Sequence, residues 1–408
     1  MIKIGIMGGT FNPIHVSHVM LGAQAKNLFG LDKVLFMPSK NPPHKDGSGL
    51  ISDLDRANMV KLAIEGNEGL EFSDFEYKRE GLTYTSDTLD LLTRENPDVK
   101  YYFIIGGDSI AYFDKWHLPA EILSKSALLV TQRADMSREE TFSQIKRIRD
   151  LFSYTNEDGS LYIPEIHYLT APAMDLSSSA IRCAVACGIP ISGMVSKNVE
   201  EYILSHSLYK IDKIEHAKEE LQKVLSPHRY IHSLSVADFA AKLAIAHGYD
   251  VVKAYTAGIL HDSAKYLTDE EILSEARRFG IVPDEIELAH PNNLLHGKIA
   301  AYYTKEKYGI DDEEIFGAIY YHTSNKPEMN TLEKIIALAD MLEYGRTMHF
   351  KPSLDIIRSV ASEDMDLALL YIYNNNVPYL LRTYSNQVCR LTIDAWDYYK
   401  KLIESRSK

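Results

Sequence analysis

The sequence predicts an α/β domain with a parallel sheet and helices on both faces, followed by an all-α domain. In the first half of the chain, short β-rich runs alternate with helical stretches, an order typical of parallel sheets. After about residue 210 the strand-like runs stop, and apolar residues recur at spacings of three and four. The length of 408 residues also exceeds what one compact core usually holds. We therefore expect two domains, at residues 1–208 and 209–408.

The first half contains five predicted strands, most of which end in glycine or polar residues. They are "KIGIMGG" (3–9), "KVLFMPS" (33–39), "YYFIIGGD" (101–108), "ALLVTQR" (127–133) and the weaker "EIHYLTA" (165–171). Helices are expected between them, near residues 15–29, 54–65 and 86–94. Parallel sheets of this kind bind ligands at the carboxyl ends of their strands. The Gly8-Gly9 turn and the segment from Gly106 to Asp108 are therefore candidate binding elements.

The second half is expected to consist of helices, which Pro and Gly residues separate. Two apolar series carry this expectation: Leu332, Ile335, Ile336, Ala339 and Leu342, and Ile231, Leu234, Ala237, Ala241 and Ala244. The polar stretch at residues 205–220 is the expected boundary between the domains.

Composition narrows the class of protein. The formal net charge of -13 argues against broad binding to nucleic acid or to a membrane surface. The three cysteines form no CxxC pair, so the sequence predicts neither a disulfide framework nor a cysteine zinc site. No signal peptide and no apolar run of about 20 residues is recognised, so a cytoplasmic protein is expected. The sequence does not determine the oligomeric state, and a homo-oligomer is one of the alternatives.

The first candidate site follows the opening strand, in "GGTFNPIHVSH" (8–18). A Gly-Gly turn admits a phosphate close to the backbone because no Cβ blocks the approach. The start of the following helix adds N–H donors and a partial positive charge. His15 and His18 fall near that helix start, where imidazoles can hydrogen-bond phosphate oxygens. Histidines three apart are usually surface residues, but this context favours a nucleotide site.

A second segment indicates the same chemistry. "DLSSSAIR" (175–182) places three serines before a predicted helix and Arg182 about one turn into it. A helix cap accounts for one serine but not for three serines followed by an arginine. Hydroxyls, backbone N–H groups and a guanidinium can together hold a triphosphate.

Together these segments resemble the HxGH nucleotidylyltransferases, whose domain is Rossmann-like, over roughly residues 1–205. Within that family, nicotinate-mononucleotide adenylyltransferases are the most similar. The similarity rests on "PSKNPPHK" (38–45), "GLTYTSDTL" (81–89), "FIIGGDS" (103–109), "FDKWH" (113–117) and "VTQR" (130–133). Two positions depart from the family motifs: Ser17 replaces the glycine of HxGH, and Ser179 replaces a threonine in ISSTxIR. Asn12 stands where the family often has aspartate. We expect these changes to tune affinity.

The resemblance implies that AMP is transferred from ATP to nicotinate mononucleotide, giving deamido-NAD and pyrophosphate. His15, His18, Arg182 and a Mg²⁺ ion would supply positive charge, and no dedicated base is required. The implied ATP-binding residues are Gly8, Gly9, Thr10, Phe11, Gly106, Asp108, Ser177, Ser178 and Ser179. The implied substrate residues are Lys45 and Arg133 for the mononucleotide, and Thr85 and Trp116 for the nicotinate ring. The alternative is a related enzyme that acts on nicotinamide mononucleotide or phosphopantetheine.

The second candidate site lies in the predicted helical half, around the pair His261-Asp262 in an apolar run. A single His-Asp pair is weak evidence for a metal site. Here, however, further histidines and an aspartate on an apolar helix face accompany the pair. An aspartate among core positions requires a cation. Imidazole and carboxylate groups are suitable ligands for Fe, Mn, Co or Zn. The candidate ligands are His232, His261, Asp262, His296, His322 and Asp340.

The order H…HD…H…H…D resembles the HD-domain metal-dependent phosphohydrolases, and most closely the symmetrical bis(5′-nucleosyl)-tetraphosphatases, over residues 220–390. This resemblance implies that two metal ions are bound and that diadenosine tetraphosphate is hydrolysed to two ADP. Iron is the first expectation for the metal, and Mn, Co and Zn are the alternatives. One ion would take His232, His261, Asp262 and Asp340, and the other Asp262, His296 and His322. Lys265 and Arg346 would neutralise substrate phosphates, whereas His228 and His290 are read as surface or loop residues. The alternative is a nucleotide sensor, an oligomerisation module or a hydrolase of other nucleotides.

Overall fold

The computed structural model describes the chain except for residues 41–49, 80, 82, 132–136, 171–175, 384–387 and 407–408. It divides the chain into two compact units, which are described separately. The N-terminal unit comprises Met1–Val185 and Pro190–Tyr209, and the C-terminal unit comprises Ala186–Ile189 and Lys210–Lys408. Within the described part of the chain, no helix has both the length and the apolar character needed to cross a bilayer.

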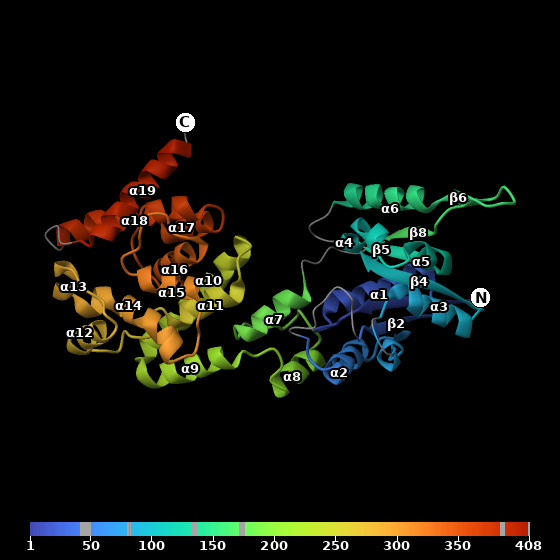
Figure 1. Ribbon diagram of the computed structural model, residues 1–408, viewed down its shortest axis with the longest axis horizontal. Helices are drawn as coiled ribbons and strands as arrows, with labels where there is room; N and C mark the ends of the chain where they lie inside the picture. The colour runs from blue at the N-terminus through green and yellow to red at the C-terminus, as the bar shows by residue number, and fades with distance from the viewer. Residues whose placement is uncertain are drawn as a thin grey trace. The chain divides into compact units, whose positions relative to one another are not determined.

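The N-terminal unit is built on a six-stranded parallel sheet in the order β3-β2-β1-β4-β5-β8 (Figure 1). The strands are β1 (Ile2–Gly9), β2 (Lys33–Pro38), β3 (Leu70–Phe72), β4 (Val99–Gly106), β5 (Ser126–Thr131) and β8 (Ile166–Leu169). All six residues of β5 are buried, as expected for a strand covered on both faces. The strand order reverses direction between β1 and β4. Open α/β sheets bind ligands at such a point, beyond the carboxyl ends of the strands.

Helices cover the two faces of this sheet. They are α1 (Val16–Phe29), α2 (Asp53–Ile64), α3 (Thr85–Glu95), α4 (Gly107–Ala111), α5 (Pro119–Lys125), α6 (Arg138–Phe152), α7 (Ser178–Ala186) and α8 (Lys197–Ser205). Helices α1 and α2 pack against β1, β2 and β3, whereas α4, α5 and α6 pack against β4, β5 and β8. Helix α1 begins after His15 and ends at Gly30, whose φ of 59° is in the left-handed region that glycine adopts without strain.

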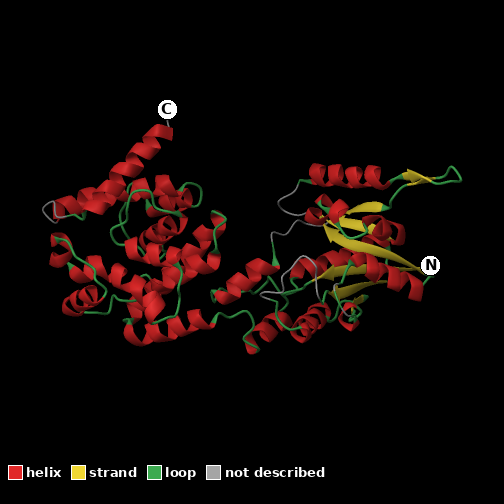
Figure 2. Ribbon diagram, in the orientation of Figure 1, coloured by secondary structure: helices red, strands yellow, loops and turns green. Residues whose placement is uncertain are grey.

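The C-terminal unit contains helices and no strand among its described residues (Figure 2). Its helices are α9 (Asp212–Val224), α10 (Pro227–Ala246), α11 (Val251–Leu260), α12 (Asp269–Arg278), α13 (Glu285–Ala289), α14 (Pro291–Glu306), α15 (Glu313–Tyr321), α16 (Thr331–Leu342), α17 (Leu354–Ala361), α18 (Met365–Thr383) and α19 (Arg390–Arg406). Helices α10, α11 and α16 pack against one another in its core. The predicted fold class, an α/β domain followed by an all-α domain, is confirmed.

Two details differ from the expectation. The short strand β3 and the two-residue strands β6 (Tyr154–Thr155) and β7 (Leu161–Tyr162) lack the long apolar runs that the other strands carry. On α10, Ile231 is the first residue of the apolar series that predicted this helix, yet its side chain is 62% exposed. The buried face starts one residue later, at His232, because that side chain is directed into the core of the unit.

Candidate functional site

The first predicted site lies at the carboxyl end of β1, where a turn leads into helix α1. His15 is the residue that caps α1, and its backbone N–H donates to Nδ1 of His18 over 3.3 Å. Because Nδ1 of His18 accepts this bond, the neutral ring carries its proton on Nε2. The two imidazole rings lie 3.7 Å apart between centroids, and the edge of Phe11 packs on His18. His18 therefore offers a fixed N–H donor beside the glycine turn.

The serine segment is tied to the same turn. Arg182 on α7 donates from Nη1 to the carbonyl oxygen of Asn12 over 2.7 Å and from Nη2 to Ser179 Oγ over 3.1 Å. Ser178 Oγ donates to the carbonyl oxygen of Pro13 over 2.8 Å, and Ser177 Oγ caps α7 by accepting from the backbone N–H of Ala180. The start of α7 is thus fastened to the loop that follows β1.

These groups line a cavity of about 470 Å³ at the point where the strand order reverses. Gly8 from β1, Gly106 from β4 and Thr131 from β5 reach it from the ends of three strands. The predicted residues that border it are Gly8, His15, His18, Gly106, Trp116, Ser177, Ser178, Ser179 and Arg182, together with the buried Ser17. Backbone N–H groups, an arginine and a fixed imidazole donor make this cavity suitable for a polyphosphate.

A second cavity of about 360 Å³ adjoins the first. It brings together Gly9, Thr10, Thr85 and Trp116, and it shares Gly8, Phe103, Ser109 and Trp116 with the larger cavity. The Trp116 ring packs against Phe113 at 5.3 Å. The predicted residue Phe11 lies outside both linings, under the turn. Lys45 and Arg133 fall outside the described residues, as does the side chain of Asp108.

Sequence reasoning missed a buried arginine beneath this site. Arg56 on α2 is 1% exposed, and its Nη1 donates to the carbonyl oxygens of Thr10 and Ser39 over 2.8 and 2.7 Å. Its Nη2 pairs with Asp53. A buried arginine needs such partners, and here they connect the turn after β1 to the end of β2. The signal in the sequence was a lone cation inside the helical run "DRANMV".

The six predicted ligands of the second site converge in the C-terminal unit. Three of the histidines hold Nδ1 2.7 Å from a backbone carbonyl oxygen: His261 from Gly258, His296 from Asn292 and His322 from Ile319. This contact places the ring proton on Nδ1 and leaves the lone pair of Nε2 as an acceptor. Metal-binding histidines are usually oriented in this way.

Asp262 lies between two groups of these ligands. Its Oδ1 is 3.0 Å from Nε2 of His296 and 4.0 Å from Nε2 of His322. Its Oδ2 is 3.6 Å from Nε2 of His261 and 3.9 Å from Nε2 of His232. Asp340 completes the second group, with Oδ1 3.0 Å from Nε2 of His232. A carboxylate whose two oxygens face different ligand groups can bridge two cations.

The ring nitrogens and carboxylate oxygens of these residues lie close enough together to be shared ligands of metal ions. Nε2 of His296 and Nε2 of His322 lie only 3.2 Å apart, although both rings present acceptor lone pairs there. Nε2 of His261 is fully buried and has no hydrogen-bond partner among the described residues. Two sets of ligand atoms lie within 4.8 Å of one another: His232, His261 and Asp340, and His261, Asp262 and His322. Converging acceptors without protons are stabilised when metal ions share them.

Electrostatics favour the protonation states that metal binding needs. Burial lowers the pKa of His261, His296 and His322, the last to about 4. Burial alone would raise the pKa of Asp262 and Asp340, but the surrounding histidines, and Arg346 at Asp340, hold both pKa values well below the ordinary range. At neutral pH His261, His296 and His322 are therefore neutral, and the two aspartates are ionised.

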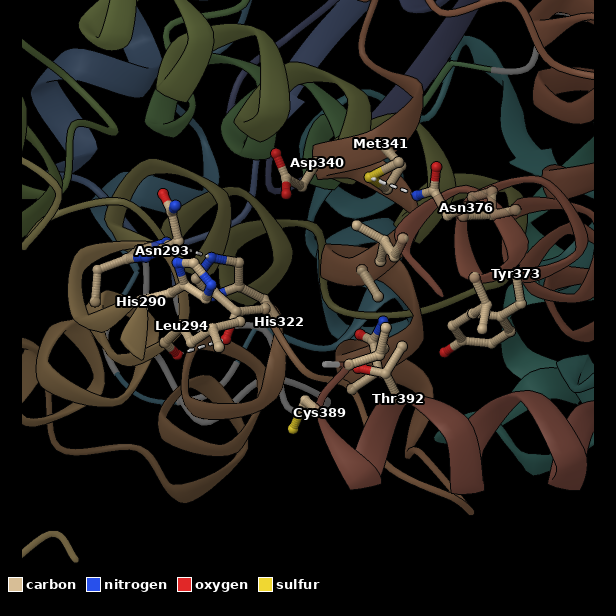
Figure 3. Close-up of a pocket in the computed structure, with 18 of the residues that line it drawn as sticks. His290, Asn293, Leu294, His322, Asp340, Met341, Tyr373, Asn376, Cys389 and Thr392 are labelled. Atoms are coloured by element: carbon tan, nitrogen blue, oxygen red, sulfur yellow. Dashed lines mark hydrogen bonds between the residues drawn. The ribbon is translucent and has the colours of Figure 1, made fainter. Parts of the chain in front are cut away.

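The metal-ligand cluster opens into a cavity of about 490 Å³ (Figure 3). Arg229, Lys265 and Arg346 line it beside the ligands. Arg229 Nη1 lies 2.8 Å from Asp262 Oδ2, and Arg346 Nη2 lies 2.5 Å from Asp340 Oδ1. Sequence reasoning missed Arg229, although it precedes His232 by one helical turn. It also missed His290, which borders the cavity, whereas His228 is exposed.

Comparisons with known proteins match each half of the chain to a family. Residues 6–184 match the cytidylyltransferase-like family, and residues 229–345 match the HD domain family. Probable nicotinate-nucleotide adenylyltransferases from Lachnoclostridium phytofermentans and Pelobacter propionicus are each 38% identical to 51% of this chain, covering 100% and 98% of their own lengths. A crystal structure of a predicted HD superfamily hydrolase involved in NAD metabolism from Clostridium acetobutylicum covers 46% of this chain and 96% of its own, at 34% identity and a TM-score of 0.43. Plasmodium falciparum nicotinic acid mononucleotide adenylyltransferase complexed with NaAD covers 51% of this chain and 98% of its own, at 19% identity and a TM-score of 0.42.

The chain therefore joins a nucleotidylyltransferase-like domain to an HD domain. Over its first half it belongs to the nicotinate-nucleotide adenylyltransferase family, because it spans whole members of that family at more than 30% identity.

Proposed function

We propose that the N-terminal unit transfers AMP from ATP to nicotinate mononucleotide, producing deamido-NAD and pyrophosphate. The observation that carries this proposal is the pair of adjoining cavities that share Gly8, Phe103, Ser109 and Trp116. The larger cavity would hold ATP, and the smaller would hold the pyridine nucleotide. The attacking phosphate and the α-phosphorus of ATP would then meet beside Gly8, where no Cβ obstructs the backbone.

The chain's own residues support an in-line transfer. The phosphate of the mononucleotide attacks the α-phosphorus of ATP, the bond to the β-phosphate oxygen breaks, and pyrophosphate leaves. His18 offers its Nε2 proton to the charge that grows on the phosphoryl oxygens, and Arg182 adds a second donor. Mg²⁺ bound with ATP would supply further positive charge. A phosphate nucleophile is already ionised, so no general base is needed.

The start of helix α3 favours nicotinate as the ring substituent. Thr83, Tyr84 and Thr85, at and just before the start of this helix, line the smaller cavity. Helix N-termini attract anions, and a carboxylate would accept bonds there. The direct test supplies the full chain with ATP and nicotinate mononucleotide. Formation of deamido-NAD and pyrophosphate in equal amounts is expected, and the absence of both would reject this function.

For the C-terminal unit we propose metal-dependent hydrolysis of diadenosine tetraphosphate to two ADP. The position of Asp262 between the two ligand groups carries this proposal, because one bridging carboxylate fits a dinuclear site. His232, His261 and Asp340 would hold one ion, and His296 and His322 the other. Iron is the expected metal, with Mn, Co and Zn as alternatives. Such ions, when bound, would supply the Lewis acidity that activates water and polarises a phosphoryl group.

Three cations support a long polyphosphate substrate. Arg229, Lys265 and Arg346 border the cavity beside the ligands and can neutralise phosphate oxygens on both sides of the cleaved bond. Hydrolysis breaks the central P–O bond, with the water oxygen going to one ADP and the bridging oxygen leaving with the other. The test is an assay of metal-supplemented full-length chain with diadenosine tetraphosphate. ADP as the sole product is expected. AMP plus ATP would overturn the symmetrical cut, and no turnover would reject the substrate.

A further inference from the structure

The loop between β1 and α1 is held in an unusual backbone conformation. Phe11 has a φ of 45°, in the left-handed region that residues other than glycine rarely adopt. Asn12, the next residue, is 2% exposed, and its carbonyl oxygen accepts the bond from Nη1 of Arg182 over 2.7 Å. Strained backbone of this kind persists where the surrounding contacts fix it. The contacts that fix Asn12 therefore also help to set the position of Arg182.

Tyr209 supplies one of these contacts from a position 197 residues further along the chain. Its hydroxyl donates to Oδ1 of Asn12 over 3.0 Å, and the backbone N–H of Ile51 approaches the same oxygen at 3.5 Å. Burial raises the pKa of Tyr209, while the nearby guanidinium groups of Arg182 and Arg56 offset part of this rise. The hydroxyl therefore stays protonated at neutral pH, as a donor must, and it lies close to the arginine that the Asn12 carbonyl holds.

The segment that ends at Tyr209 is fastened to the N-terminal unit by contacts of its own. It begins with α8, which packs on α2 (Figure 1). Tyr202 on α8 donates from its hydroxyl to Oδ1 of Asp55 over 2.9 Å and accepts from Nδ2 of Asn58 over 2.9 Å. Beyond α8, Tyr209 has a φ of 64°, again in the left-handed region. Tyr209 is thus held in a costly backbone conformation at the place where its hydroxyl reaches Asn12.

We propose that Tyr209 is a positioning residue for adenylyl transfer, acting on Arg182 through Asn12. The path consists of two hydrogen bonds, one from the Tyr209 hydroxyl to the Asn12 side chain and one from Arg182 to the Asn12 carbonyl. Tyr209 is not among the described residues that line the two nucleotide cavities, whereas Arg182 borders the larger one. During transfer, charge grows on phosphoryl oxygens there. A donor that is already held in place stabilises this charge more than one that must first be ordered.

This inference rests on the proposed adenylyl transfer, and its test separates the two. Full-length protein is compared as wild type, Tyr209→Phe and the matched control Tyr202→Phe. The control removes a hydroxyl from the same segment, but one that bonds to α2 and not to the loop after β1. The measured quantities are kcat, KM for nicotinate mononucleotide, Tm, and the side-chain Nε–H NMR signal of Arg182, which is assigned by its loss in Arg182→Lys. The rates are measured again in an Arg182→Ala background.

Tyr209→Phe should lower kcat roughly fivefold, the usual effect of one hydrogen bond, and should leave KM within about twofold of wild type. In the Arg182→Ala background the same substitution should lower kcat no further, because the residue through which it acts is gone. A loss of folded protein would instead lower the rate in both backgrounds. Tyr202→Phe should keep the wild-type kcat, whatever its effect on Tm.

The Arg182 signal should shift or broaden in Tyr209→Phe and stay unchanged in Tyr202→Phe. The proposal is overturned if Tyr209→Phe retains the wild-type kcat or the wild-type Arg182 signal. It is also overturned if the effect on kcat is undiminished in the Arg182→Ala background. If wild type forms no deamido-NAD, the proposed reaction fails, and the Arg182 signal alone decides whether Tyr209 positions this side chain.

Discussion

Oε1 of Glu343 lies 3.3 Å from Nδ1 of His232, and both side chains are buried. Glu343 is held in place by the backbone N–H of Gly345, which donates to its Oε2 over 2.5 Å. The carboxylate accepts the Nδ1 proton of His232 and so directs Nε2 toward Asp340. The other three histidines are oriented by backbone carbonyls, so His232 alone among the four proposed histidine ligands depends on a side chain for its orientation.

Glu343→Gln should therefore weaken metal binding roughly tenfold or more, a typical effect of removing such a carboxylate. Metal content would be measured after dialysis against graded chelator concentrations. Glu333→Gln is the matched control, because Glu333 is also buried but lies at the other end of α16, where it pairs with Lys326 and caps the helix. That control should lower Tm while retaining metal. Equal metal retention by both variants would contradict the role of Glu343.

Asp262→Ala should remove both metal ions and end phosphohydrolysis, because its two oxygens face both ligand groups. His296→Ala should weaken only one ion, since His296 contacts only Oδ1 of Asp262. Elemental analysis gives the stoichiometry of each variant. Adenylyl transfer by the same preparations is the internal control for folding. Retention of two ions by the Asp262 variant would show that this carboxylate does not bridge.

His18→Ala should lower adenylyl transfer by about 10²–10³, the usual cost of losing a donor to transition-state charge. The cause is the loss of the Nε2 proton that the His15 backbone contact holds in place. His167→Ala is the control, because His167 lies on the exposed part of β8 and contacts Glu165. A decrease below threefold for His18→Ala, with Tm unchanged, would exclude this role.

Nicotinate mononucleotide should be preferred over nicotinamide mononucleotide in kcat/KM. The proposed site at the start of α3 favours a carboxylate, whose two oxygens both accept hydrogen bonds, whereas a carboxamide replaces one of these oxygens with an NH₂ donor. Thr85→Ala should narrow the preference. Thr93→Ala, on the same helix but bonded to the Leu89 carbonyl, should leave it intact. Equal kcat/KM values for the two substrates in wild type would refute the proposed selectivity.

Metal-depleted protein should lose stability in its C-terminal unit as pH falls from about 6.5 to 4. The pKa of folded His322 is lowered to about 4, so in this window the unfolded chain binds the proton and the folded chain does not. His322 alone should contribute about 3 kcal/mol of this loss. Trp116→Phe leaves Trp396 as the sole tryptophan to report unfolding of this unit. His322→Asn should flatten the dependence, and a pH-independent unfolding midpoint would contradict the expectation.

The fold class was predictable because its signals are local. The glycine turn after the first strand and the series from Leu332 to Leu342 each lie within one element, where hydrophobic period and turn chemistry act. Metal-ligand candidates were recognisable because imidazole and carboxylate groups in apolar helices need a partner. The short strand β3 was missed because three residues carry too little pattern to predict a strand.

The groups that sequence reasoning missed depend on tertiary packing. Arg229 reaches Asp262 only because α10 packs against α11, and no spacing in the sequence encodes that contact. From the sequence alone, Arg56 is indistinguishable from a polar residue on the surface of a helix. In the structure it is buried under the glycine turn.

The path of the backbone has a practical consequence. Ala186–Ile189 belongs to the C-terminal unit, whereas the chain on both sides of it belongs to the N-terminal unit. Cys187 in this segment is 1% exposed and is part of the helical core. A fragment that begins at residue 209 would lack this piece and leave a gap in its interior. Separating the two units by truncation would therefore damage one of them, and point substitutions in the intact polypeptide are the sounder way to study each.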